Sequence, residues 1–136
     1  MGESPRPEGR PPLVDNHDWD GNAKRGITFR ITDSKPEFQY SNGEWQSLFA
    51  SAPLTRDIWH HMAVACDSSM VRLYVDGVED ASTRIHGKPL PAKYSLQIGR
   101  SPYETKRQFT GTLAEVMLFN RALSAEEVAK LAGGKK

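Results

Sequence analysis

Hydrophobic and polar residues alternate along short segments of this chain. In residues 26–32, isoleucine and phenylalanine occupy every second position, with threonine and arginine between them. Residues 70–75 repeat the pattern with valine and leucine. A period of two is typical of a β-strand that buries one face. Further strands are expected at residues 37–40, 45–50, 59–67, 94–99 and 111–119.

Turn-forming residues separate these segments at close intervals. Asn42-Gly43 lies between two of the expected strands and is a strong hairpin signal. The Asp67-Ser68-Ser69 segment separates the next two strands, and Asp76-Gly77 predicts a tight turn directly after them. The strands are therefore expected to pair with their neighbours in antiparallel sheets.

Only residues 124–131 have a helical period. Ser124 and Glu127 have the spacing of a capping box, in which each satisfies a backbone N–H of the other, and Gly133 suits the end of the helix. The pattern predicts an all-β fold, an antiparallel two-sheet sandwich, with one short C-terminal helix.

The composition predicts a single domain with a short leader before it and a short tail after it. Residues 1–12 contain four prolines and few apolar side chains, so we expect a flexible leader there. Residues 13–132 form the expected domain, and residues 133–136 a tail. No apolar run approaches the ~20 residues that span a membrane.

The net charge and the single cysteine bear on the expected partners and on the need for a disulfide. The net charge of +1 gives no electrostatic reason to expect nucleic acid as a partner. Cys66 is the one cysteine, so the fold needs no internal disulfide. Its apolar surroundings in the sequence predict an inert, buried thiol.

Three motifs in order resemble one known family. They are the Trp-His-His strand at residues 59–65 with Asp67 and residues 71–78, the Leu-Gln-Ile-Gly-Arg strand at 96–100 after Pro-Leu-Pro at 89–91, and the closing strand and turn at 111–124. Together they are similar to laminin-G-like and pentraxin-like domains of the concanavalin A-like lectin/glucanase superfamily. The resemblance implies a jelly-roll sandwich, and it places Trp59 in the core.

The chain departs from that family at its start. Relatives open with two or three strands before the position that Leu13 occupies here, so the resemblance implies an incomplete domain. A sandwich without those strands exposes a sheet edge. The expected core is otherwise intact, and we predict that the edge pairs with a strand-donating partner or, most simply, in a two-fold homodimer. That core comprises Ile27, Phe29, Val64, Leu73, Val75, Ile98, Val116 and Leu118.

Catalytic patterns are missing from the sequence. Glycosidases of this superfamily place paired carboxylates two residues apart on one strand, whereas Glu79-Asp80 and Glu126-Glu127 are adjacent pairs outside such a strand. No nucleophile elbow, phosphate-binding glycine loop or Cys/His metal spacing occurs. The domain is therefore predicted not to be an enzyme.

Residues 15–22 are rich in the oxygen donors that calcium prefers. Asp18 and Asp20 flank one residue, and Gly21 permits a sharp turn. The segment lacks the later glutamate of an EF-hand, and Ala114 stands where the family often has aspartate. A calcium site at Asp18 and Asp20 and a polar loop without an ion both remain open.

Sugar binding needs an aromatic face beside polar groups. The candidates are Trp19, Trp45 and Tyr103 in expected loops and turns, and Tyr74 on the polar side of its strand. Each could instead be a packing residue.

The resemblance implies an extracellular, cell-surface or periplasmic setting and a carbohydrate or glycoprotein ligand. The sequence is thus interpreted as a non-catalytic binding module. The alternative is a structural or assembly module that pairs through an exposed sheet edge.

Overall fold

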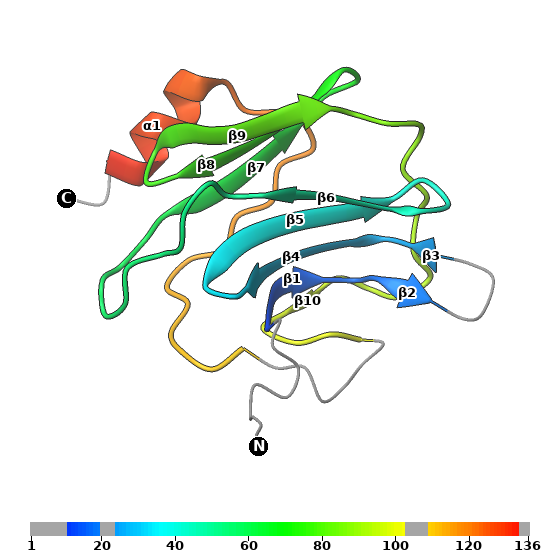
Figure 1. The fold of residues 1–136 in the computed structure, drawn as a ribbon, viewed down its shortest axis with the longest axis horizontal. Helices are drawn as coiled ribbons and strands as arrows, with labels where there is room; N and C mark the ends of the chain where they lie inside the picture. The colour runs from blue at the N-terminus through cyan, green and yellow to red at the C-terminus, as the bar shows by residue number, and fades with distance from the viewer. Residues whose placement is uncertain (1–10, 20–23, 103–108, 134–136) are drawn as a thin grey trace.

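The computed structural model describes residues 11–19, 24–102 and 109–133, apart from the side chain of Trp19. Two antiparallel sheets and a C-terminal helix make up the fold, as predicted (Figure 1). No helix in these residues is both long enough and apolar enough to span a membrane.

The larger sheet contains five strands. Each strand pairs antiparallel with its neighbours, and β4 and β5 are joined by a tight turn in which Asp33 and Ser34 both have positive φ. In sheet order the strands are β10 (Gln97–Ile98), β1 (Pro12–Asp15), β4 (Ile27–Thr32), β5 (Lys35–Ser41) and β6 (Trp45–Phe49). β1 thus begins at Pro12, the last residue of the predicted leader.

The smaller elements complete the sandwich. A three-stranded sheet has the order β7 (Met62–Cys66), β8 (Met70–Val75) and β9 (Val78–Arg84). A two-stranded pair, β2 (Asp18–Trp19) and β3 (Lys24–Arg25), extends from β1 and β4. Helix α1 (Ala125–Gly133) lies against the three-stranded sheet, on the side away from the larger sheet (Figure 1).

The core lies between the two sheets. Phe38 and Tyr40 of β5 pack with Val71 of β8, because alternate residues of each strand face the opposite sheet. Phe29 and Val64, both predicted core residues, pack around this cluster. Burying such side chains supplies the main driving force for folding, at about 1.5–3 kcal/mol for each fully buried large side chain.

The predicted turns form as the residue types require. Asp76 and Gly77 both adopt positive φ in the two-residue β8–β9 turn, a backbone conformation that aspartate tolerates and glycine adopts without strain. In the β7–β8 turn, Asp67 Oδ1 accepts hydrogen bonds from the backbone N–H groups of Ser69 and Met70 at 2.7 and 2.8 Å. Local sequence therefore sets the register of the three-stranded sheet.

The helix begins with the predicted capping box. The Glu127 N–H donates to Ser124 Oγ at 3.1 Å, and the Ser124 N–H donates to Glu127 Oε1 at 2.8 Å. Arg121 adds a bidentate ion pair to Glu127 at 2.9 and 2.8 Å. These contacts hold the pKa of the Glu127 carboxyl at about 2.

Two predictions about the apolar segments are wrong. Residues 111–119 were expected to form a strand but have no regular structure. The predicted core residues Ile98, Val116 and Leu118 are exposed. Trp59 was also expected in the core, yet 67% of its surface is exposed. It precedes β7, which begins only at Met62, so the Trp-His-His motif lies outside the sheet.

Cys66 ends β7 as an exposed residue, which corrects the prediction of a buried side chain. Its sulfur is partly shielded from water, and this desolvation together with the nearby Asp67 raises the thiol pKa to about 11. The thiol is therefore protonated at neutral pH and is a poor nucleophile, in line with the predicted inertness.

Candidate functional site

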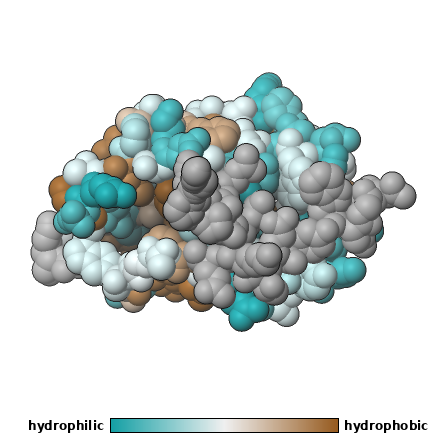
Figure 2. Space-filling model, turned by 60° about the horizontal axis from the view of Figure 1, so that its bottom comes forward, coloured by the Kyte–Doolittle hydropathy of each residue, from teal (hydrophilic) through white to brown (hydrophobic). Residues whose placement is uncertain are grey.

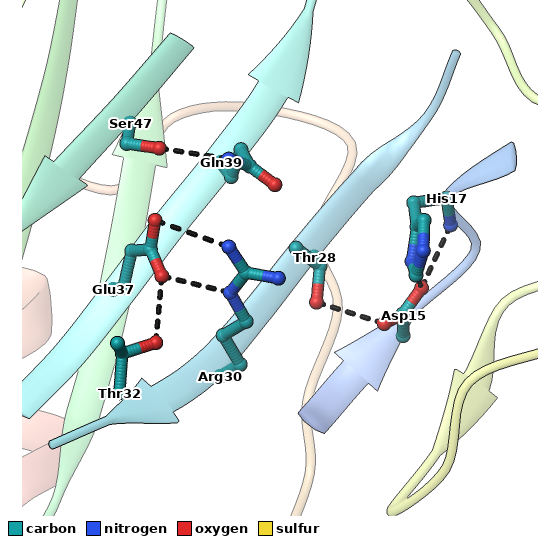
Figure 3. A network of polar contacts seen from close by, with 8 residues as sticks. All are labelled: Asp15, His17, Thr28, Arg30, Thr32, Glu37, Gln39 and Ser47. Atoms are coloured by element: carbon teal, nitrogen blue, oxygen red, sulfur yellow. Dashed lines mark hydrogen bonds and ion pairs between the residues drawn. The ribbon is translucent and has the colours of Figure 1, made fainter. Parts of the chain in front are cut away.

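The larger sheet has a polar face on the side away from the core. Positions that alternate with the core residues of β1, β4 and β5 carry charged and polar side chains, and these contact one another across the strands (Figure 3). Such side chains are held by the strand register, so the face is a rigid array of donors and acceptors.

A buried ion pair lies on this face. Arg30 of β4 and Glu37 of β5 are paired residues, and the guanidinium contacts the carboxylate at 2.7 Å through Nε and 3.3 Å through Nη2. Thr32 donates to Glu37 Oε1 at 2.7 Å. Burial acts to raise the pKa of the Glu37 carboxyl, but Arg30 and the hydrogen bonds outweigh it and hold that pKa below its usual range.

A second polar group surrounds Asp15 of β1. Asp15 Oδ1 accepts from the His17 backbone N–H at 2.7 Å and lies 2.6 Å from His17 Nδ1. The hydroxyl of Thr28, on β4, donates to Asp15 Oδ2 at 2.9 Å. All three residues are buried, so this group orders the inner part of the face.

The accessible part of the face follows the edge strand β6. Trp45, Ser47 and Phe49 occupy alternate positions of β6 and therefore share this face. The side chain of Gln39, on β5, donates to Ser47 Oγ at 2.9 Å (Figure 3). Trp45 and Gln39 are half-buried, whereas Ser47 and Phe49 are exposed. We name these four residues the β6 platform.

The buried groups hold one end of the β6 platform in place. The rings of His17 and Trp45 meet edge to face, with centroids 5.9 Å apart and planes at 78°. Because Asp15 fixes the His17 ring, Trp45 has a rigid support. The platform thus offers two aromatic rings with an amide and a hydroxyl between them, an arrangement that suits a sugar chain.

The structure separates the predicted ligand residues. Trp45 lies in the β6 platform, whereas Tyr74 is only 2% exposed and packs with Ala65 beneath Val128 of α1. The prediction that Tyr74 lines an open sheet face is therefore wrong, because the helix covers that face. Tyr103 and the side chain of Trp19 lie outside what the structure describes.

Sequence reasoning missed three platform residues, Gln39, Ser47 and Phe49. Phe49 resembles a core residue when it is considered alone, but two-residue steps from Trp45 through Ser47 place it on the polar face. Gln39 lies opposite Ser47 in the hairpin that the Asn42-Gly43 turn predicts. The register of that hairpin was the signal that could have found all three residues.

The family that this sequence matches agrees with the two-sheet sandwich. A laminin-G family model, described as the concanavalin A-like lectin/glucanases superfamily, matches residues 6–129. The chain belongs to this superfamily. Membership confirms the resemblance carried by the three motifs. A search of curated protein sequences finds no match.

Solved structures similar to this superfamily member share its fold. The carbohydrate-binding module CBM40 of the Ruminococcus gnavus IT-sialidase superposes with a TM-score of 0.75 at 15% identity, over 91% of this chain and 74% of that one. The binding domain of Paraclostridial Mosquitocidal Protein 1 gives 0.64 at 16% identity, over 92% and 31%.

An S-layer domain-containing protein from Clostridium thermocellum ATCC 27405, residues 221–444, gives a TM-score of 0.52 at 23% identity. The match covers 92% of this chain and 64% of that structure, so this superfamily member spans less than two thirds of it. At these identities the likenesses concern the fold.

Asp18, the first predicted calcium ligand, lies in β2 with its carboxylate fully buried. Among the described residues, neither carboxylate oxygen has a hydrogen-bond partner. A buried charge without a partner is costly, and a bound cation would satisfy it. Asp20, the second predicted ligand, lies outside the described residues. Within the described part of the chain no three His, Cys, Asp or Glu side chains form a metal cluster, so further ligands there would be carbonyl or amide oxygens.

Proposed function

We propose that this domain is a non-catalytic carbohydrate-binding module, and that its ligand, a glycan or the glycan of a glycoprotein, binds along the β6 platform. The observation that carries the proposal is the alternation of Trp45, Ser47 and Phe49 along an edge strand, with Gln39 beside them. Aromatic rings stack on the apolar faces of sugars, and the amide and hydroxyl groups can bond sugar hydroxyls.

The length of the platform favours an oligosaccharide over a single sugar. Trp45 and Phe49 are four residues apart, which corresponds to about 13 Å along an extended strand. That distance exceeds one pyranose ring. A ligand that contacts both rings must therefore run parallel to β6.

The state of the carboxylates supports a binding role over hydrolysis. A glycosidase needs one carboxylic acid with a raised pKa, which protonates the leaving group. Glu37 has the opposite shift, since its pKa is lowered, and it is held by Arg30. Asp15 is bonded to His17 and Thr28. Both groups therefore support the face and do not act on a substrate.

Superfamily membership and the likeness to a carbohydrate-binding module support this ligand class. The likeness to an S-layer domain-containing protein supports an extracellular or cell-surface setting. A glycan array probed with the purified chain, with and without calcium, tests the proposal. We expect binding to a set of related oligosaccharides. A folded protein that binds no glycan under either condition would refute it.

We further propose that calcium binds at Asp18, where it would neutralise the buried carboxylate. Calcium should raise the melting temperature, with stabilisation of about 2.7 kcal/mol when the free ion is a hundredfold above its Kd. Asp18→Asn should remove this response. It should not destabilise the calcium-free protein, because asparagine has the same shape as aspartate but carries no charge to bury.

Asp57→Asn is the matched control for this prediction, because Asp57 is exposed and outside the strands. The control should respond to calcium as the unaltered chain does. Equal melting temperatures of the unaltered chain in calcium and in chelator would exclude the site.

A further inference from the structure

Residues 50–61 connect β6 to β7 and therefore join the larger sheet to the three-stranded one. A backbone hydrogen bond holds the first part of this loop, since the Leu54 N–H donates to the Ser34 carbonyl at 2.8 Å. Among the described residues, no backbone–backbone bond joins residues 55–60 to another segment. A side chain holds this second part of the loop instead.

That side chain is His60, whose two ring nitrogens both have oxygen partners. Nδ1 lies 2.9 Å from Asp76 Oδ2, in the β8–β9 turn, and Nε2 lies 3.0 Å from the carbonyl oxygen of Thr55. Asp76 Oδ1 also accepts a hydrogen bond from the His61 backbone N–H at 3.0 Å. The ring therefore connects the middle of the loop to the turn between β8 and β9.

The chemistry of these partners determines the charge of the ring. A carbonyl oxygen and an ionised carboxylate only accept hydrogen bonds, so each ring nitrogen must carry a hydrogen to bond its partner. Neutral histidine has a hydrogen on one ring nitrogen, whereas the imidazolium ion has one on both. The two contacts of His60 are thus those of the protonated ring. Without the extra proton, a nitrogen lone pair would face either Thr55 or Asp76.

We propose that protonated His60 holds residues 55–60 against the β8–β9 turn, and that loss of this proton at alkaline pH releases them. The neutral ring can keep one of its two contacts but not both. The turn stays in place because it belongs to the paired strands β8 and β9, so the loop is the part that moves. The β6 platform takes no part in these contacts, so the loop can respond to pH whether or not the platform binds sugar.

The pKa shifts of the two side chains agree with this geometry. The hydrogen bond to Asp76 raises the pKa of His60 above its usual 6.5, although partial burial opposes the rise. Burial acts to raise the pKa of the Asp76 carboxyl, but the bonds from the His61 N–H and the His60 ring outweigh it and hold that pKa below its usual value.

The sign of each shift defines the pH range in which the loop is held. The stabilisation is fully present between the ordinary carboxyl and imidazole pKa values, about 4 and about 6.5. It is lost as the pH rises through the raised pKa of His60, and also as the pH falls through the lowered pKa of Asp76.

Other charged groups nearby do not act on the ring. Among the described residues, Asp76 is the charged group that contacts His60 and shifts its pKa. Helix α1 also lies close to the turn, where Ala132 is beside Gly77. The charged or titratable residues of the loop, of β9 and of α1 that are not partners of the ring in this part of the chain are Arg56, Asp57, His61, Glu79, Glu126, Glu127 and Lys130.

The loop carries apolar side chains that face solvent. Ile58 and Trp59 are 59% and 67% exposed, and they directly precede His60. The apolar surface of the domain is uneven, since hydrophobic side chains gather on one half of the face that Figure 2 shows. Release of the loop therefore changes where two exposed apolar side chains lie.

Nuclear magnetic resonance on the full chain tests the proposal in a titration from about pH 5 to about pH 9. The midpoint of the His60 ring signals should lie above 6.5. The order parameters of residues 55–59 should fall from about 0.85 to below about 0.6 with the same midpoint, because released backbone moves on the nanosecond timescale. Order parameters report this release, whereas chemical shifts also respond to the charge alone.

Asp76→Asn should cancel the alkaline release. Asparagine tolerates the positive φ of position 76, so the turn is kept. Its amide can donate to Nδ1 of the neutral ring while Nε2 donates to Thr55, so both contacts form without the extra proton. The pKa of His60 should fall in this variant, and residues 55–59 should stay ordered at alkaline pH.

Two histidine variants complete the test. His60→Gln should remove the pH dependence of residues 55–59, because glutamine has no proton to lose in this range. His86→Gln is the matched control, since His86 is an exposed histidine of the 85–96 loop, and it should keep the whole transition. A His60 midpoint at or below 6.5, order parameters that do not follow that midpoint, or an alkaline release that persists in Asp76→Asn would overturn the proposal.

Discussion

Arg30→Met is expected to lower the free energy of unfolding by about 3–5 kcal/mol, because it leaves the buried Glu37 carboxylate without its counter-charge. Glu37→Leu should cost a similar amount by stranding the guanidinium. The double variant Arg30→Met/Glu37→Leu should recover most of the loss, since a buried ion pair and an apolar pair of similar size are close in stability. Urea denaturation of the four proteins measures the coupling.

The matched control is Arg121→Met, which removes an exposed bidentate pair with Glu127. Its loss should lower the free energy of unfolding only slightly, because water screens exposed charges. If the Arg30 and Glu37 single variants lower the free energy of unfolding no more than this control does, the ion pair does not make the polar face rigid.

Protonation of Glu37 in acid should also remove the stabilisation that the Arg30–Glu37 ion pair gives. The folded pKa of Glu37 is lowered, so its contribution is fully present above the ordinary carboxyl pKa of about 4.3 and is lost as the pH falls through the lowered value. The stability difference between the unaltered chain and the single variants should therefore shrink in strong acid. A difference independent of pH would contradict the ion pair.

Trp45→Ala is expected to weaken glycan binding by about tenfold to a hundredfold, because an aromatic anchor supplies much of the binding energy at such a site. Phe49→Ala should weaken binding of longer oligosaccharides but leave that of a disaccharide nearly unchanged, since Phe49 is about 13 Å along the strand. Calorimetry with glycans of increasing length separates the two effects.

Trp59→Ala is the control for this prediction. Trp59 is an exposed tryptophan outside both sheets, so its removal should leave the affinity unchanged. Equal loss from Trp59→Ala and Trp45→Ala would place the ligand elsewhere. Retention of the melting temperature in each variant shows that the comparison concerns binding.

Local signals predicted the fold because they act over a few residues. The period of two, the Asn42-Gly43 and Asp76-Gly77 turns and the Ser124–Glu127 capping box all formed as the sequence indicates. Each depends on backbone geometry and neighbouring hydrogen bonds. The two-sheet sandwich follows once these hairpins bury their apolar faces.

The wrong predictions concern which segment covers a strand or a sheet face, and the alternation of apolar and polar residues along a strand does not show this. Tyr74 was expected on the face of β8 opposite Val71, and the two residues do lie in different clusters, but α1 packs against Tyr74. Residues 111–119 have the pattern of a strand but find no sheet edge within the described chain. Both outcomes depend on contacts between distant segments.

The candidate site was predicted only in part for the same reason. Trp45 was identified from its residue type and its turn. Gln39, Ser47 and Phe49 join it through the β5–β6 register. The support from His17 depends on how β1 leads into β2. Residue type alone gives one member of the site, and pairing across strands gives the rest.

Binding of sugars along β6 is tested most directly by nuclear magnetic resonance. The titrant is the oligosaccharide with the strongest signal on the glycan array, added to ¹⁵N-labelled protein. Backbone and side-chain amide shifts should change at Gln39, Trp45, Ser47 and Phe49, and they should remain constant in residues 113–119. Saturating binding whose shifts fall outside β5 and β6 would contradict the account.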